Sequence, residues 1–142
     1  MIATPVSLAM SRPAETVAAS VSAREAARRM HREGIGSLVL VEDERPAGIL
    51  TRSDLLGLVA AGGDPDATTV GDLQRRAPVT ITPGDSVRDA ARLMARERIS
   101  HLPVVENDEL VGVCSATDLA RVLPTHHIRA IERAGNRHVA GE

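Results

Sequence analysis

The chain has 142 residues, enough for one compact domain or for two small repeats that share a core. Hydrophobic residues make up 43% and charged residues 25%, which is typical of a folded globular protein and argues against disorder. With 17 basic and 19 acidic residues the formal net charge is -2, so the charge does not favour binding to nucleic acid or to an anionic membrane. No apolar stretch reaches the roughly 18 residues of a membrane span, and no signal peptide is apparent, so we expect a cytoplasmic protein.

Two features of composition bear on the interior and on chemistry. The chain has no Phe, Tyr or Trp, so Val, Leu, Ile, Met and Ala must fill the core, and a bound base would contact aliphatic side chains. The single cysteine, Cys114, lies in an apolar run, which predicts a buried thiol in a reducing compartment. Because no P-loop, no zinc-binding cysteine pair and no other catalytic motif occurs, we predict neither an enzyme nor a metal site.

The first predicted elements are a short strand around Thr16 and then a helix that begins after Ser22. Ser22 and Glu25 have the Ser-x-x-Glu spacing of a capping box. Apolar residues then recur at the spacing of a helix with one buried face. They are Ala23, Ala26, Ala27 and Met30.

A hairpin and a second helix are predicted next. Two strand-like runs, 37–41 and 47–50, flank the acidic turn residues 42–44, which predicts an antiparallel hairpin. A helix is expected over residues 52–61. The sequence 62–65, Gly-Gly-Asp-Pro, is typical of a linker.

The second half repeats the first at a constant offset of 64 positions, the distance from Met30 to Met94. It predicts a lead-in strand, a helix capped by Ser86, strands at 101–105 and 110–114, and a helix over 116–123. Identities between the copies include Ala26, Arg28, Met30, Arg32, Glu33, Leu38, Gly48, Asp54 and Leu55, which match Ala90, Arg92, Met94, Arg96, Glu97, Leu102, Gly112, Asp118 and Leu119.

The duplication predicts the domain organisation. We expect repeat 1 over residues 1–63, repeat 2 over 64–123, and a C-terminal helix and tail over 124–142. Each repeat has the order strand, helix, strand, strand, helix, an α+β or α/β arrangement in which neither half covers its own sheet. Two repeats related by a pseudo-twofold axis, with grooves between them, are the predicted fold.

A short motif stands at the same place in both copies: Gly, two apolar residues, Thr or Ser, two variable residues, then Asp. Its fixed positions are Gly48, Thr51, Asp54 and Gly112, Ser115, Asp118. With the preceding helix and the Leu-Pro-Val-Val run at 102–105, this pattern resembles the CBS domain, and the resemblance extends from about residue 6 to residue 123. It implies a stand-alone CBS-domain pair, or Bateman module. Many relatives are regulatory, bind AMP, ADP, ATP or S-adenosylmethionine, and form homodimers.

The motif has a chemical rationale and also a competing one. A strand that runs directly into a helix at Thr51 or Ser115 directs a hydroxyl and the first helical N–H groups at one place, which favours a phosphate. Asp54 and Asp118 lie one turn further on, where a carboxylate can accept hydrogen bonds from ribose hydroxyls. The same residues also have the spacing of capping boxes, which need no ligand.

Other candidate ligand contacts surround the motif. Arg52 and His101 are candidates for phosphate, although an exposed arginine at a helix start and an exposed histidine at a strand end are equally ordinary. The base and the pocket wall are assigned to residues of the lead-in strands, of the turn after the first helix, and of the Leu-Pro strand. Core packing explains the apolar ones without a ligand. The residues assigned to the base and the pocket wall are Thr16, Val17, Ile35, Gly36, Thr80, Ile81, Ile99, Ser100 and Pro103.

Three functions fit these observations. A regulatory homodimer that senses an adenosine-containing ligand and acts on an unidentified target protein uses both motifs. A structural dimerisation module with empty grooves follows if the motifs are only helix caps. A nucleic-acid-binding accessory protein would need a basic patch from residues 75–76 and 128–135, but aromatic stacking is lacking, so we expect no nucleic-acid partner. The adjacent His126 and His127 point in different directions on a helix and are not expected to bind metal.

Overall fold

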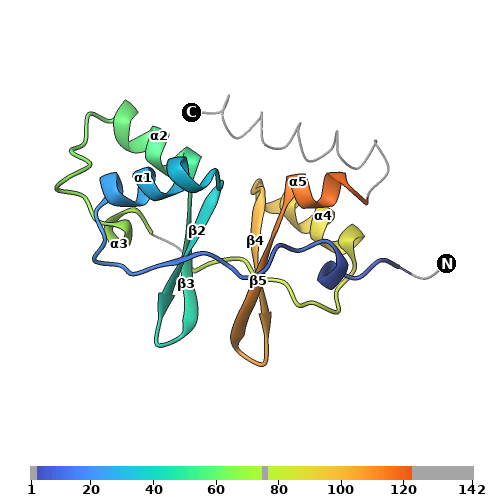
Figure 1. Ribbon diagram of the computed structural model, residues 1–142. Helices are drawn as coiled ribbons and strands as arrows, with labels where there is room; N and C mark the ends of the chain where they lie inside the picture. Colours follow the sequence, from blue (N-terminus) through green and yellow to red (C-terminus); the bar gives the residue numbers. More distant parts are fainter. Residues whose placement is uncertain (1–2, 75–76, 123–142) are drawn as a thin grey trace. The chain divides into compact units, whose positions relative to one another are not determined.

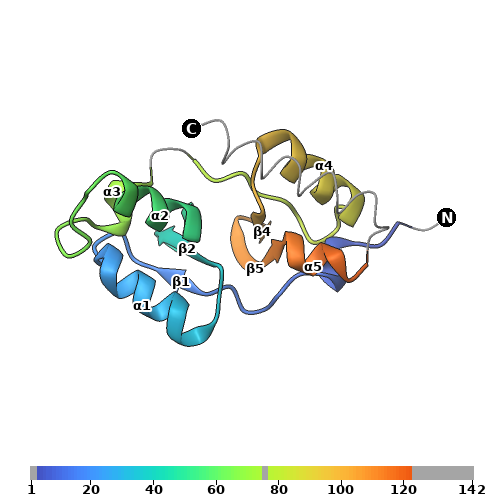
Figure 2. The ribbon, with the colours of Figure 1, turned by 90° about the horizontal axis from the view of Figure 1, so that it is seen from above.

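The computed structural model describes residues 3–74 and 77–122 (Figure 1 and Figure 2). They divide between two compact units: Ala14–Pro78 forms one, and residues 3–13 together with 79–122 belong to the other. None of the helices in these ranges is long and apolar enough to cross a membrane. The elements in chain order are η1 Val6–Leu8, β1 Thr16–Val17, α1 Ala23–Glu33, β2 Ser37–Glu42, β3 Arg45–Thr51, α2 Arg52–Ala60, α3 Val70–Leu73, α4 Val87–Glu97, β4 His101–Glu106, β5 Glu109–Ser115 and α5 Ala116–Ala120.

The unit Ala14–Pro78 contains a mixed sheet in the order β1-β2-β3. β1 pairs with β2 in parallel, and β2 pairs with β3 as the predicted antiparallel hairpin, with Ser37 opposite Thr51. At the hairpin turn Asp43 and Glu44 have φ values of 51° and 65°, the left-handed conformations that a two-residue turn requires. In Figure 1 the hairpin tip points away from α1 and α2.

Helix α1 begins directly after Ser22, where the sequence predicts, and runs to Glu33. The Oγ of Ser22 accepts a hydrogen bond from the Glu25 N–H at 3.1 Å, and Gly34 ends the helix with φ 65°. The buried face of α1 packs on the sheet, because its small and flexible side chains lie on one stripe. The core of this unit consists of Val17, Ala26, Met30, Leu38, Leu40, Leu50 and Val70.

The other unit repeats this plan with small changes. Ser86 caps α4 by accepting from the Asp89 N–H at 3.0 Å, and β4 and β5 form the predicted hairpin. The lead-in of this copy is not a strand: Ile81 makes only an isolated bridge to Val104. The core consists of Val6, Ala9, Ile81, Val87, Ala90, Ala91, Met94, Leu102, Val104, Cys114 and Leu119.

Two short helical turns, which the sequence did not predict, join each core to the lead-in of the other copy. Val6 in η1 and Val70 in α3 are equivalent under the 64-residue offset, and both are 0% exposed. Val6 packs with the core of the second copy and donates its N–H to Asp85 O at 2.7 Å. Val70 packs with the core of the first copy and donates to Val21 O at 2.8 Å. The compact units are therefore composed of residues from both sequence repeats.

The last helix is shorter than predicted. α5 ends at Ala120 instead of residue 123, and Val122 N–H bonds to Leu119 O in a turn. The candidate residues at 75–76, His126, His127 and the predicted helix at 128–135 lie outside the described residues.

Candidate functional site

The motif in the unit Ala14–Pro78 places a carboxylate at the point where strand becomes helix. β3 ends at Thr51 and α2 begins at the next residue. Oδ2 of Asp54 accepts hydrogen bonds from the Thr51 N–H at 2.8 Å and from the Thr51 hydroxyl at 3.3 Å. Burial raises the pKa of the Asp54 carboxyl, although the bonds from Thr51 act in the opposite direction. Asp54 is only partly buried, so part of its surface stays accessible.

The motif of the second copy is a complete capping box with an additional donor. Oδ2 of Asp118 accepts from the Ser115 N–H at 2.9 Å, and Ser115 Oγ accepts from the Asp118 N–H at 3.1 Å. The Ser11 hydroxyl, far away in sequence, donates to Asp118 as well. Arg121 Nη1 lies 3.8 Å from Oδ1. Asp118 is only 4% exposed, so these groups enclose its carboxylate.

Three of the other candidate residues lie beside the motifs. His101 is opposite Ser115 in the β4–β5 ladder, and its Nδ1 is 3.1 Å from Ser100 Oγ. The Ser100 carbonyl accepts a hydrogen bond from the Ala116 N–H at 2.9 Å, at the first residue of α5. In the other unit Arg52 is exposed at the first position of α2. The structure thus brings Ser100 and His101 to the Ser115 motif, and Arg52 to the Thr51 motif.

Gly48 and Gly112 of the motifs lie close to residues from the lead-in segments, and a side chain at either glycine would collide with them. A Cβ on Gly112 would lie 2.7 Å from the Ser11 carbonyl oxygen. A Cβ on Gly48 would lie 2.5 Å from Gln74 Oε1, which accepts a hydrogen bond from the Ile49 N–H at 2.9 Å. Each glycine therefore faces a residue of the other copy's lead-in segment. Sequence reasoning missed Ser11 and Gln74, since a serine and a glutamine in loop positions carry no distinctive signal.

The residues assigned to the base and the pocket wall fall into three groups by exposure. Val17, Ile81 and Pro103 are buried in the cores, while Ile35 and Ile99 are half-buried and pack against them. Gly36 is also half-buried. Thr16, Thr80 and Ser100 are the exposed members of this set.

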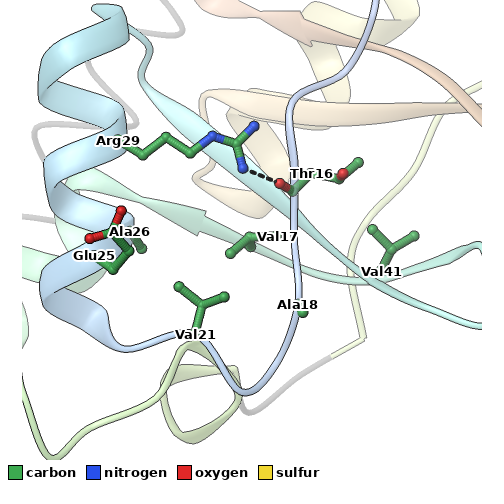
Figure 3. A pocket seen from close by; sticks show the side chains of 8 residues that line it. All are labelled: Thr16, Val17, Ala18, Val21, Glu25, Ala26, Arg29 and Val41. Atoms are coloured by element: carbon green, nitrogen blue, oxygen red, sulfur yellow. Dashed lines mark hydrogen bonds between the residues drawn. The ribbon is translucent and has the colours of Figure 1, made fainter.

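A cavity of about 440 Å³ lies between α1 and β1 (Figure 3). Of the candidates, Thr16 and Val17 line it, whereas Thr51 and Asp54 do not. The Arg29 guanidinium at its edge donates to the Thr16 carbonyl, as the dashed line in Figure 3 shows. The remaining lining residues are Ala18, Val21, Glu25, Ala26 and Val41.

Neither metal ligands nor an activated thiol is found in the described residues. No group of three His, Cys, Asp or Glu side chains within 3–74 and 77–122 is placed to hold a metal ion. Cys114 is 0% exposed, and burial raises the pKa of its thiol to about 12. A thiol that stays protonated is a poor nucleophile, which agrees with a packing role for Cys114.

Comparison with protein-family models places both copies in one family. The model of the CBS domain matches residues 6–61 and 70–125. The chain belongs to the CBS-domain family. In this CBS-domain pair the two matches are the two sequence repeats, which confirms the duplication and the predicted fold class.

Curated relatives of this pair include Hypoxic response protein 1 of Mycobacterium tuberculosis, 35% identical over 106 residues that cover 72% of this chain and 73% of the relative. An uncharacterized protein of Methanopyrus kandleri is also 35% identical over 106 residues, covering 72% of this chain. The match spans only 54% of the length of that protein. The relatives therefore include proteins that extend well beyond the part that matches this chain.

One solved relative contains adenosyl compounds. The CBS-domain pair of protein MJ0100, in complex with 5'-methylthioadenosine and S-adenosyl-L-methionine, is 26% identical to this chain, with a TM-score of 0.78. The similarity covers 85% of this chain and 96% of that structure. The CBS-pair fold is thus shared with a protein that binds two adenosine-containing molecules.

Proposed function

We propose that this CBS-domain pair is a regulatory module that binds AMP, ADP, ATP or a related adenosyl ligand such as S-adenosylmethionine. The observation that carries the proposal is the partly exposed Asp54 carboxylate at the junction of β3 and α2, next to the Thr51 hydroxyl. An acceptor pair of this kind suits a ribose diol, and the complex of MJ0100 shows that a CBS-domain pair can hold such a sugar. We further propose a cytoplasmic location, no catalysis, and an unidentified target protein.

The surroundings of each candidate side chain support the proposed roles. Asp54 accepts from the ribose hydroxyls, and Arg52 at the exposed start of α2 contacts phosphate. His101 and Ser115 form the corresponding polar pair in the other unit. The apolar residues assigned to the pocket wall are half-buried or buried. We propose that the accessible part of these side chains contacts the base.

The missing aromatic residues allow a direct test. Because the chain has no Trp, Tyr or Phe, the purified protein should absorb almost nothing near 280 nm. We would denature it, filter it, and record the 260 nm spectrum and the mass of the released compound. A stoichiometric adenine compound supports the proposal and identifies the ligand. An empty filtrate would mean that no ligand survives purification and would count toward empty sites.

A matched pair of variants separates ligand binding from helix capping. Asp54→Asn alters a carboxylate proposed to bind ligand, whereas Asp72→Asn alters one that only caps α3. Asp72 accepts from the Thr69 N–H at 2.9 Å in the same type of capping box. If Asp54 binds ligand, only Asp54→Asn loses the adenine compound. Equal retention by both variants would contradict the assignment.

A second function, homodimerisation, is favoured by the surface of α2. None of the nine residues of this helix is buried, although four of them are Leu or Val. Leu56 and Val59 are 68% and 70% exposed. We propose that a second copy of the chain covers this face, because an uncovered apolar stripe on a helix is unfavourable in water. The dimer is compatible with ligand binding and would remain if the binding sites were empty.

A further inference from the structure

The Asp118 carboxylate already holds a hydroxyl group of this chain. Ser11 Oγ lies 3.1 Å from Oδ1 and 3.3 Å from Oδ2, so the hydroxyl sits between the two oxygens. Both residues belong to the same compact unit, although 107 positions separate them in sequence. Because Asp118 is only 4% exposed, a ribose hydroxyl that used its carboxylate as an acceptor would have to compete with the Ser11 hydroxyl.

Backbone pairing fixes Ser11 over the motif. Its N–H donates to Val113 O at 2.8 Å, and the Val113 N–H donates back to Ser11 O at 3.1 Å. The absent side chain of Gly112 makes this approach possible, since a Cβ there would meet Ser11 O at 2.7 Å. Ser11 is thus a fixed part of the strand edge, and its hydroxyl is presented to Asp118 without an added ordering cost.

The two motifs therefore differ in how open their carboxylates are. Asp118 is 4% exposed and accepts from two different residues. Asp54 is partly exposed, and in the part of the chain that the structure describes it accepts only from Thr51. Among the described residues, the Ser11 carbonyl and the Met10 side chain face Gly112, whereas the Gln74 side chain faces Gly48.

We propose that the Ser11 hydroxyl is an intramolecular competitor that keeps the Asp118 motif closed to ligand, while the Asp54 motif is open. The inference rests on the proposed adenosine-ligand function and deepens it, because it makes the two sites unequal. Ligand reaches Asp118 only when the Ser11 hydroxyl leaves the carboxylate. A hydrogen bond to a charged group changes an equilibrium by about 10-fold or more, so Ser11 sets the affinity of the second site on that scale.

The test uses titration calorimetry with AMP, ATP and S-adenosylmethionine, each added separately to the full chain. Asp54→Asn silences the open site, so that the remaining heat reports the Asp118 site. Adding Ser11→Ala to Asp54→Asn should raise the affinity of that site about 10-fold. Adding Asp118→Asn to this double variant should abolish the gain. Ser7→Ala, in the same lead-in segment, is the control and should have no effect.

A second pair of variants guards against a folding defect. Ser11→Thr keeps the hydroxyl. Ser11→Val has the same shape as Ser11→Thr but carries a methyl group in place of the hydroxyl, so only Ser11→Val should open the Asp118 site. If wild type binds and neither Ser11→Ala nor Ser11→Val raises the second affinity, the competitor role is wrong and the proposed function stands. If neither the wild type nor any variant binds any of the three compounds, the proposed function is wrong, and the inference about Ser11 is wrong as well.

Discussion

Arg29 Nη2 lies 2.7 Å from Glu15 Oε2. The same guanidinium donates to the Thr16 carbonyl (Figure 3), so Arg29 joins α1 to β1 and to the residue before it. The equivalent positions of the second copy carry Leu93 and Val79, which pack against the core cluster there. The contact between the helix and the lead-in segment is therefore polar in the unit Ala14–Pro78 and apolar in the other unit.

Arg29→Ala should destabilise the protein only slightly. The side chains of Arg29 and Glu15 are 28% and 43% exposed, so solvent screens the pair and the ion pair contributes less than about 1 kcal/mol. The bond to the Thr16 carbonyl adds a similar amount, which predicts a loss of roughly 1 to 2 kcal/mol in urea unfolding. The double variant Glu15→Val with Arg29→Leu, copied from the second repeat, should recover most of it. A loss above about 3 kcal/mol would contradict this account.

The two motif glycines should respond unequally to alanine. At Gly112 the new Cβ meets the Ser11 backbone at 2.7 Å, which cannot move alone, so Gly112→Ala should cost about 2 to 3 kcal/mol. At Gly48 the neighbour is the end of the Gln74 side chain, which can turn away, so Gly48→Ala should cost about 1 kcal/mol. Chemical denaturation measures both values.

Gly57 supplies the control for that comparison. A Cβ at Gly57 in α2 has nothing within 4 Å, so Gly57→Ala should stabilise the helix by about 0.5 to 1 kcal/mol. If Gly112→Ala and Gly57→Ala behaved alike, the close passage of Ser11 over Gly112 would be wrong.

Local patterns in the sequence predicted those parts of the fold that depend on neighbouring residues. The spacing from Ser22 to Met30 identifies α1 because cap and apolar stripe lie within one helix, and the acidic turn at 43–44 identifies its hairpin. Each of the two short helical turns, η1 and α3, packs on the core of the other copy, and no local sequence pattern predicts this exchange. Val6 and Val70 look like any valine in a loop until their packing partners, far away along the chain, are known.

The same limit applies to the candidate site. The Thr51 and Ser115 motifs could be located because each is contiguous in sequence and occurs twice. The contact between Ser11 and Asp118 could not, since it joins residues from opposite ends of the chain and since either residue alone is an ordinary polar residue. The same spacing also predicts capping boxes, and the structure shows capping geometry at both motifs. Ligand binding at them stays a prediction.

Stability at alkaline pH should depend on Cys114. The chain has no Tyr and no Lys, so Cys114 is the side chain that titrates between pH 9 and 12. Its pKa is raised from 9.0 to about 12 in the folded state, so the stabilisation is complete below pH 9 and is lost as the pH rises toward 12. The free energy of unfolding should fall by about 1.4 kcal/mol per pH unit in that window. Cys114→Val should remove the slope, and an equal slope in both proteins would contradict the burial of the thiol.

Oligomeric state should depend on α2. Leu56→Glu places a charge on the face proposed to bind a second copy, so light scattering after size-exclusion chromatography should show a dimer for wild type and a monomer for the variant. Leu8→Glu makes the same change at another exposed leucine, 75% exposed in η1, and should remain dimeric. A monomeric wild type, or a dimer for both variants, would refute the α2 interface.

Calorimetric titration of the wild-type chain with AMP, ATP and S-adenosylmethionine decides whether this CBS-domain pair binds an adenosine-containing ligand. We predict saturable binding of at least one of these compounds, and a loss of about 10-fold or more in affinity on Asp54→Asn but not on Asp72→Asn. Absence of saturation with all three compounds, in a folded protein, would contradict ligand sensing and leave dimerisation as the function of this CBS-domain pair.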